Sequence, residues 1–130
     1  MNQPERSPLH TAAMADDVAM LEALLAAGES PDVQDEQGFT PLHFAAQEHS
    51  LSAGVALLNA GATVDLENAF GNTALFVAVF NSKGRGELID LLRSSGADPL
   101  HANASGQTPV GLARLIGNYD VDQFFSDISE

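Results

Sequence analysis

The 130-residue sequence predicts an all-α solenoid of four stacked helix-turn-helix units, and three recurring patterns carry this prediction. The first is a seven-residue segment. Residues 7–13 read SPLHTAA, and residues 40–46 read TPLHFAA, a shift of 33. Looser copies follow at 73–79 (TALFVAV) and at 108–114 (TPVGLAR). Repetition at this period over the whole chain indicates consecutive copies of one structural unit.

The second and third patterns keep the same register as the first. A Leu-Leu pair is followed by a glycine in the segments 24–28, 57–61 and 91–96. An Asp or Asn precedes a glycine by three residues in the segments 35–38, 68–71 and 103–106. Three patterns in one register predict where each unit begins and ends.

The residue types of each unit explain its expected structure. The Asp/Asn-x-x-Gly segment is turn chemistry, because glycine tolerates positive φ. Thr then caps a first helix, and Pro takes the first helical position, where its missing N–H costs nothing. Leucines at i, i+3 and i+4 form the apolar side of a second helix that ends at glycine. The expected helix pairs are 8–15 with 18–27, 41–48 with 52–60, 74–80 with 87–95, and 109–116 with 120–127.

These patterns resemble the ankyrin repeat, whose T-P-L-H-x-A-A motif and 33-residue period are nearly intact here. The resemblance covers residues 1–130 as a single domain with degenerate terminal repeats that act as caps. It implies an ankyrin-repeat solenoid with β-turn fingers, and a hydrogen-bonded structural role between repeats for His10 and His43. The expected repeats are approximately 4–34, 35–67, 68–102 and 103–130.

The third and fourth repeats depart from the family pattern. The third has Ala74 for Pro, Phe76 for His, and two extra residues within 81–86. The fourth has Gly111 for His and lacks the Leu-Leu-Gly element. Its last helix is expected to close the stack with an apolar face formed by Val121, Phe124, Phe125 and Ile128. The acids expected to face water there are Asp120, Asp122, Asp127 and Glu130.

Charge excludes some classes of partner. Five Lys and Arg against eighteen Asp and Glu give a formal charge of −13, which repels phosphate backbones and anionic lipids. We therefore expect neither nucleic-acid nor membrane binding. Residues 7–82 hold ten acids and no Lys or Arg. This excess either serves solubility alone or complements a basic partner. The absence of Cys and of a signal-peptide pattern predicts a cytoplasmic protein.

No catalytic pattern emerges from the sequence. Neither H-E-x-x-H, G-x-S-x-G nor phosphate-loop spacing occurs, so we expect no enzyme, no metal and no cofactor. His49 and His101 are expected in loops without a carboxylate at ligand spacing.

The resemblance implies a binding surface at the turn tips and on the exposed side of the first helices. Met14, Phe39, Phe70 and Phe80 are expected to form an apolar stripe, with any of the phenylalanines alternatively packing back on a neighbouring turn. Leu115 and Ile116 are expected in the core. The predicted partner-binding residues are Met14, Asp16, Asp17, Glu36, Gln37, Phe39, Gln47, Glu48, Phe70, Asn72, Phe80 and Asn81, with Asp16, Asp17, Glu36 and Glu48 as an acidic rim.

The functional expectation is a non-catalytic protein-protein interaction module, monomeric when unbound, that binds a basic protein through its concave face. A narrower hypothesis is an immunity or antitoxin-type inhibitor of a basic effector. The alternative is a regulatory or scaffolding adaptor that tethers an enzyme or transcription factor without inhibiting it. Lys83 and Arg85 are either a solvated insertion or an edge contact for an acidic part of the partner.

Overall fold

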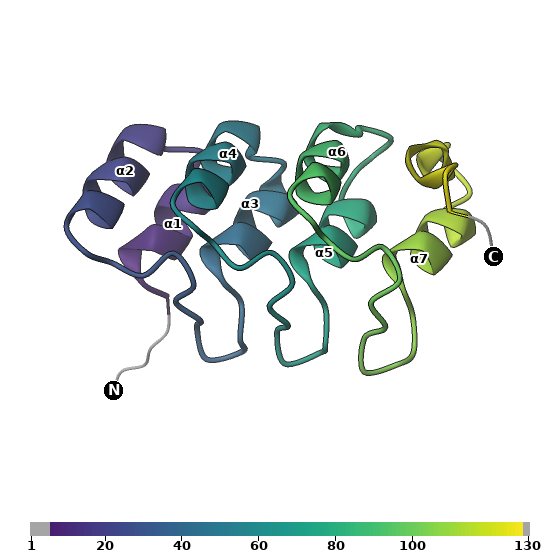
Figure 1. Ribbon diagram of the computed structural model, residues 1–130, viewed down its shortest axis with the longest axis horizontal. Coiled ribbons are helices and arrows are strands. Elements are labelled where there is room, and N and C mark those ends of the chain that lie inside the picture. The colour runs from purple at the N-terminus through teal and green to yellow at the C-terminus, as the bar shows by residue number, and fades with distance from the viewer. Residues whose placement is uncertain (1–5, 129–130) are drawn as a thin grey trace.

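A computed structural model describes residues 6–128 as two rows of short helices (Figure 1). The first row holds α1 (Pro8–Met14), α3 (Pro41–Glu48), α5 (Ala74–Phe80) and α7 (Pro109–Leu115). The second row holds α2 (Val18–Ala26), α4 (Leu51–Asn59), α6 (Glu87–Ser94) and the 3₁₀ helix η1 (Val121–Phe125). No strand occurs within the described residues. The expected all-α solenoid of stacked helix pairs is therefore confirmed, and the predicted bounds of α1 to α7 agree within one residue at either end.

The first helix of each unit begins as the sequence predicts. Ser7, Thr40, Thr73 and Thr108 each accept a hydrogen bond from a backbone N–H inside the first turn. Proline takes the first position of α1, α3 and α7, whereas α5 begins with alanine. The caps satisfy N–H groups that the helix itself leaves without acceptors.

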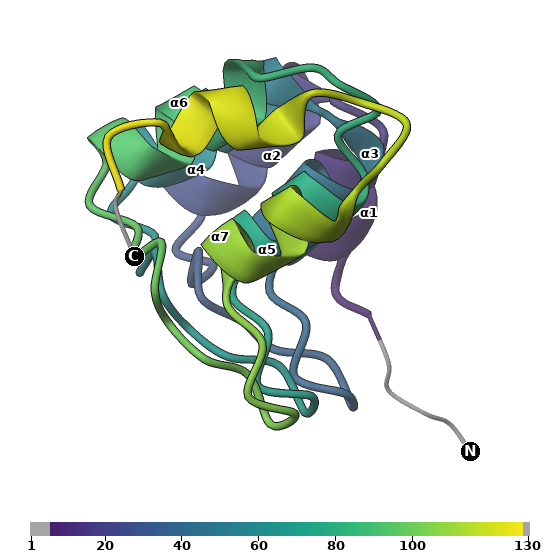
Figure 2. The same cartoon turned by 90° about the vertical axis from the view of Figure 1, so that its right-hand side faces the viewer.

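The turns 35–38, 68–71 and 103–106 form three fingers that project from the first-row helices (Figures 1 and 2). Neighbouring fingers are joined by backbone hydrogen bonds, from Ala69 N–H to the Gln37 carbonyl at 2.8 Å and from Ala104 N–H to the Phe70 carbonyl at 3.1 Å. Gly71 has φ of +76°, and a Cβ there would lie 2.6 Å from the Ala104 nitrogen. Glycine is therefore required both for the turn and for the approach of the next finger.

The core runs through the stack between the two rows. Each first-row helix packs on the next, α1 on α3, α3 on α5 and α5 on α7. At one register position, Leu9, Leu42, Leu75 and Val110 are almost completely buried. The fingers project at an angle to the first-row helices, and the surface inside this angle is the concave face of the molecule (Figure 2).

The prediction of an α-helix at 120–127 is wrong, since this segment forms the shorter 3₁₀ helix η1. Arg93 donates to the Phe124 carbonyl at 3.0 Å, and Ile128 N–H bonds instead to the Phe125 carbonyl, three residues back. The segment therefore ends with the i→i−3 hydrogen bonding of a 3₁₀ helix, and Arg93 binds the Phe124 carbonyl from the preceding repeat.

The expected apolar face of this segment nevertheless packs on the core. Val121 and Phe125 are fully buried, and Phe124 and Ile128 are partly buried against the same cluster. The acids Asp120, Asp122 and Asp127 are exposed as expected, and Glu130 lies outside the described residues.

Two hydrogen bonds from the Arg93 guanidinium, at 2.7 and 2.8 Å, hold the exposed Asp127 carboxylate. These bonds lower the pKa of Asp127 to about 2. None of the helices described in residues 6–128 is long and apolar enough to cross a membrane.

Candidate functional site

A pocket of about 350 Å³ lies on the concave face, where two neighbouring fingers meet α3 and α5. We call it the aromatic pocket. It brings together six of the twelve predicted binding residues, from four separate segments of the chain. Its lining residues are Phe39, Gln47, Asn68, Phe70, Asn72, Phe76, Val77, Phe80 and Asn81.

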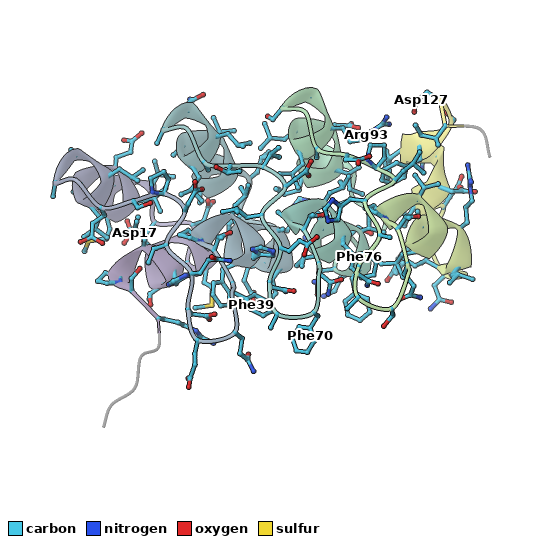
Figure 3. All side chains as sticks on the ribbon, turned by 60° about the horizontal axis from the view of Figure 1, so that its bottom comes forward. Asp17, Phe39, Phe70, Phe76, Arg93 and Asp127 are labelled. Atoms are coloured by element: carbon cyan, nitrogen blue, oxygen red, sulfur yellow. The ribbon has the colours of Figure 1, made fainter. Side chains whose placement is uncertain are left out.

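Phe70 and Phe80 are the exposed apolar groups of this pocket. Phe70 is 54% exposed and Phe80 is 70% exposed. The backbone of Phe70 is held on both sides, because its N–H donates to Asn68 Oδ1 at 2.9 Å and its carbonyl accepts from Ala104. Figure 3 shows the Phe70 ring at a finger tip, pointing away from the helices. The ring is therefore presented to solvent on a fixed support.

The apolar stripe predicted from four side chains is not continuous. The Phe39 ring stacks on Phe44, with centroids 5.2 Å apart, and packs on the core with only part of its surface in the pocket. Met14 also packs on the core and does not line the pocket. The alternative of a ring that packs back on the protein thus applies to Phe39, whereas Phe70 and Phe80 project.

Two acids predicted on the rim have a structural role instead. Asp17 caps α2, accepting from the Met20 N–H at 3.1 Å. Asp16 Oδ1 accepts from the Ala53 N–H of α4 at 2.7 Å, in the next repeat. The residue that precedes α4, Ser50, makes no cap of its own. Figure 3 shows Asp17 beside the first helices, well separated from the aromatic residues labelled at the fingers. Neither acid lines the aromatic pocket.

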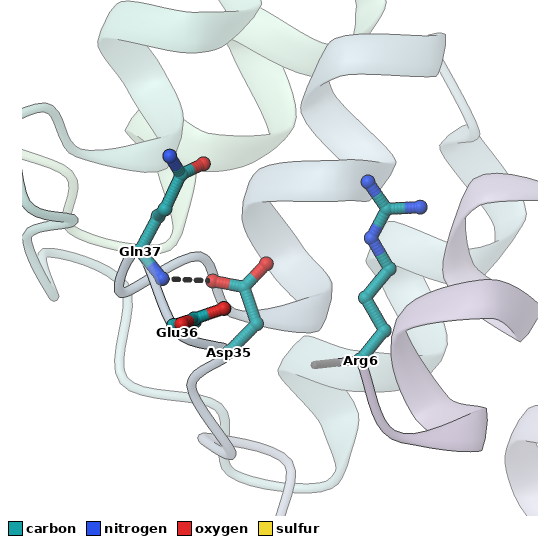
Figure 4. A pocket seen from close by; sticks show the side chains of 4 residues that line it. All are labelled: Arg6, Asp35, Glu36 and Gln37. Atoms are coloured by element: carbon teal, nitrogen blue, oxygen red, sulfur yellow. Dashed lines mark hydrogen bonds between the residues drawn. The ribbon is translucent and has the colours of Figure 1, made fainter. Parts of the chain in front are cut away.

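Glu36 and Gln37 lie in a separate hollow of about 760 Å³ beside the first finger, together with Asp35 and Arg6 (Figure 4). Asp35 Oδ1 accepts from the backbone N–H of Gln37 at 2.9 Å and so shapes the turn. The Glu36 side chain is exposed. It therefore supplies negative charge at the first finger, outside the aromatic pocket.

Glu48 borders a third hollow of about 450 Å³, which we call the charged pocket. Its lining residues are Gln47, Glu48, Asn81, Lys83 and Arg85. Gln47 and Asn81 also line the aromatic pocket, so the two hollows are adjacent.

Sequence reasoning missed three residues of the aromatic pocket: Asn68, Phe76 and Val77. Phe76 occupies the position where the family motif has His. That substitution was the available signal, because a phenylalanine ring cannot make the hydrogen bond that histidine makes at this position and is apolar instead. Leu115, expected in the core, is instead 71% exposed at the end of α7. Ile116 packs partly against the core, as expected.

The two motif histidines connect repeats as the resemblance implies. His10 Nε2 lies 2.8 Å from the Phe39 carbonyl, and His43 Nε2 lies 2.8 Å from the Asn72 carbonyl. His43 Nδ1 accepts from the Thr40 N–H at 3.1 Å, so the ring is the neutral tautomer that donates through Nε2. Burial lowers the pKa of His43, which favours this neutral form.

The other two histidines do contact carboxylates, contrary to expectation. His49 Nε2 lies 3.4 Å from Glu87, and His101 contacts Glu67. Both partners come from other repeats, so sequence spacing did not reveal them. Within residues 6–128, no group of three His, Asp or Glu side chains could hold a metal ion.

The stacked helix pairs and fingers define a helical-repeat solenoid. A family model described as ankyrin repeats, in three copies, matches residues 9–103, and the chain belongs to the ankyrin-repeat family. Ankyrin repeats generally mediate protein-protein interaction, and the family is typically non-catalytic. No curated protein gives a significant match to the chain.

Proposed function

We propose that this ankyrin-repeat chain is a cytoplasmic, non-catalytic module, monomeric when unbound, that binds a protein partner through the aromatic pocket. The observation that carries the proposal is the pair of exposed rings, Phe70 and Phe80, around a 350 Å³ hollow. Apolar anchors on fixed supports lose little conformational freedom on binding, and a few such residues dominate the affinity of an interface.

The partner is proposed to be basic. The chain carries a formal charge of −13, Glu48 borders the hollow adjacent to the aromatic pocket, and Glu36 lies at the tip of the first finger. Charge of this sign raises the rate of association with a basic protein and disfavours acidic competitors. An immunity or antitoxin-type inhibitor that covers the basic active site of an effector is the narrower form of this proposal.

The test is affinity capture from native cells with two tagged forms, the wild type and the Phe70→Ala/Phe80→Ala variant. We expect one basic protein to be retained by the wild type and lost from the double variant, with circular dichroism unchanged because both rings are exposed. Met20→Ala is the matched control, since Met20 is 50% exposed but lies on α2. Equal retention by the double variant would rule out the aromatic pocket as the binding site.

The purified pair then separates the two forms of the proposal. An inhibitor abolishes the partner's activity at a one-to-one ratio when it is added to the activity assay. An adaptor, which tethers an enzyme or transcription factor, leaves that activity unchanged.

A further inference from the structure

The insertion between α5 and α6 is a fixed platform on the concave side of the third repeat. Arg85 Nε donates to the Ser82 carbonyl at 2.9 Å within the loop. A Cβ at Gly84 would lie 3.0 Å from the Tyr119 ring, and one at Gly86 would lie 2.2 Å from the Phe124 ring. The loop is thus packed against two aromatic side chains of the C-terminal segment, which hold it in one position.

Two positive charges on this platform lack an ionic partner. Lys83 and Arg85 are both exposed, and neither forms an ion pair with any residue between 6 and 128. Arg93, by contrast, is neutralised by Asp127, and Arg6 lies over the Phe44 ring. On a chain of net charge −13, this is a local reversal of sign.

These two charges lie beside the aromatic pocket. They line the charged pocket, and Gln47 and Asn81 belong to both hollows. A segment that fills the aromatic pocket therefore brings its neighbouring residues next to Lys83 and Arg85. Glu48, across the same hollow, disfavours a second acid there.

We propose that the bound partner segment carries a single carboxylate directly beside its apolar anchor, and that Lys83 and Arg85 bind this carboxylate. The proposal rests on the proposed function, because it names the chemistry of the partner at the same site. Basic residues of the partner then face Glu36 at the first finger, and its single acid faces Lys83 and Arg85 at the third repeat. The order of charges along the face then fixes the direction in which the segment lies.

The probe is a phage-displayed library of random 16-residue peptides, selected on the wild-type full chain and counter-selected on Phe70→Ala/Phe80→Ala. We expect the selected sequences to place Asp or Glu within a few residues of a large apolar residue. A synthetic consensus peptide and its Glu→Gln form are then titrated by fluorescence polarisation. Each removed ion pair should weaken binding by about two- to five-fold, a size typical of exposed pairs.

Charge reversal distinguishes ion pairing from loop damage. Lys83→Glu should bind a Glu→Lys peptide more tightly than the consensus, a preference that a damaged loop would not produce. Ser52→Asp on α4 is the matched control, because Ser52 is exposed, lies outside both pockets and also adds negative charge.

Three outcomes contradict the inference. Selected peptides without an enriched acid, or an unchanged preference in Lys83→Glu, overturn the carboxylate proposal and leave the aromatic pocket intact. Failure to select peptides that depend on Phe70 and Phe80 overturns the proposed function, and the inference with it.

Discussion

The second and third repeats differ most at one position of their common motif. In the second, His43 is buried and joins two repeats through the Asn72 carbonyl. In the third, Phe76 takes the same position, has no side-chain donor and lines the aromatic pocket. The second and third fingers are connected instead by a side-chain hydrogen bond, from Asn103 Nδ2 to Asn72 Oδ1 at 2.8 Å.

This difference separates a repeat that keeps the motif histidine from one that has exchanged it for an aromatic ring. The second repeat keeps the hydrogen bonds that stabilise the stack. The third gives up one of them, and the buried ring of Phe76 forms part of the wall of the aromatic pocket, beside the exposed rings of Phe70 and Phe80. Departure from the family motif therefore marks the candidate site more directly than agreement with it.

We expect the largest effect from exchanging the side chains of His43 and Phe76. His43→Phe leaves the Thr40 N–H without its acceptor and removes one donor from the Asn72 carbonyl, which still accepts from the Asn68 N–H, so we expect a loss of about 2–3 kcal/mol in unfolding free energy. Phe76→His should change stability by less than about 1 kcal/mol, because it leaves no such partners unpaired. Urea denaturation of both variants measures the difference. Equal losses would contradict the division of roles between the repeats.

The finger that links the two repeats is tested by Gly71→Ala. This variant places an alanine at positive φ and also brings its Cβ close to the Ala104 nitrogen. We therefore expect about 2–3 kcal/mol of destabilisation. Gly106→Ala is the control, since Gly106 has φ of +82° but no atom within 4 Å of the added Cβ. Its cost should be about 1 kcal/mol, from the backbone alone. Equal destabilisation by the two variants would mean that the approach of the next finger is not what requires glycine at position 71.

Phe39→Ala and Phe70→Ala separate an aromatic side chain that supports the fold from one that is presented to solvent. Phe39 is half-buried and stacked on Phe44, so truncation should cost about 2 kcal/mol. Phe70→Ala should change the unfolding free energy by less than about 0.5 kcal/mol. Thermal unfolding followed by circular dichroism tests the pair. Destabilisation by Phe70→Ala that matches Phe39→Ala would mean that Phe70 is part of the core.

The smallest expected effect is a pH dependence from His43. Its pKa is lowered in the folded protein, so below about pH 6.5 the unfolded chain binds a proton that the folded state does not. The contribution of His43 to stability is present above that pH and is lost as pH falls towards the folded pKa. We therefore expect the stability difference between wild type and His43→Phe to shrink from pH 7.5 to pH 5.5. A constant difference would contradict the burial of a neutral ring.

The helices and fingers could be predicted because their determinants are local. Threonine caps, proline at the first position and glycine at positive φ act within a few residues of one another. The 3₁₀ conformation of η1 could not be predicted from local patterns, and the segment also contacts Arg93 of the preceding repeat, which sequence spacing does not reveal.

Half of the predicted binding residues meet in the aromatic pocket, and three of the others have contacts elsewhere in the fold. Met14 packs on the core, Asp17 caps α2, and Asp16 accepts from the N–H of Ala53 in the next repeat. Each of these side chains contacts a residue that cannot be identified from its position within the repeat alone. Position within a repeat indicates the face on which a residue lies, but not whether its side chain is already occupied.

The cap that Asp16 supplies to α4 has a consequence for how such a chain can evolve. The carboxylate and the helix that needs it are encoded in different repeats. A duplication or transfer of the second repeat alone would therefore leave the start of α4 without its acceptor, and the recipient would have to provide an acid in the preceding turn. The heritable unit in this part of the molecule is longer than one repeat.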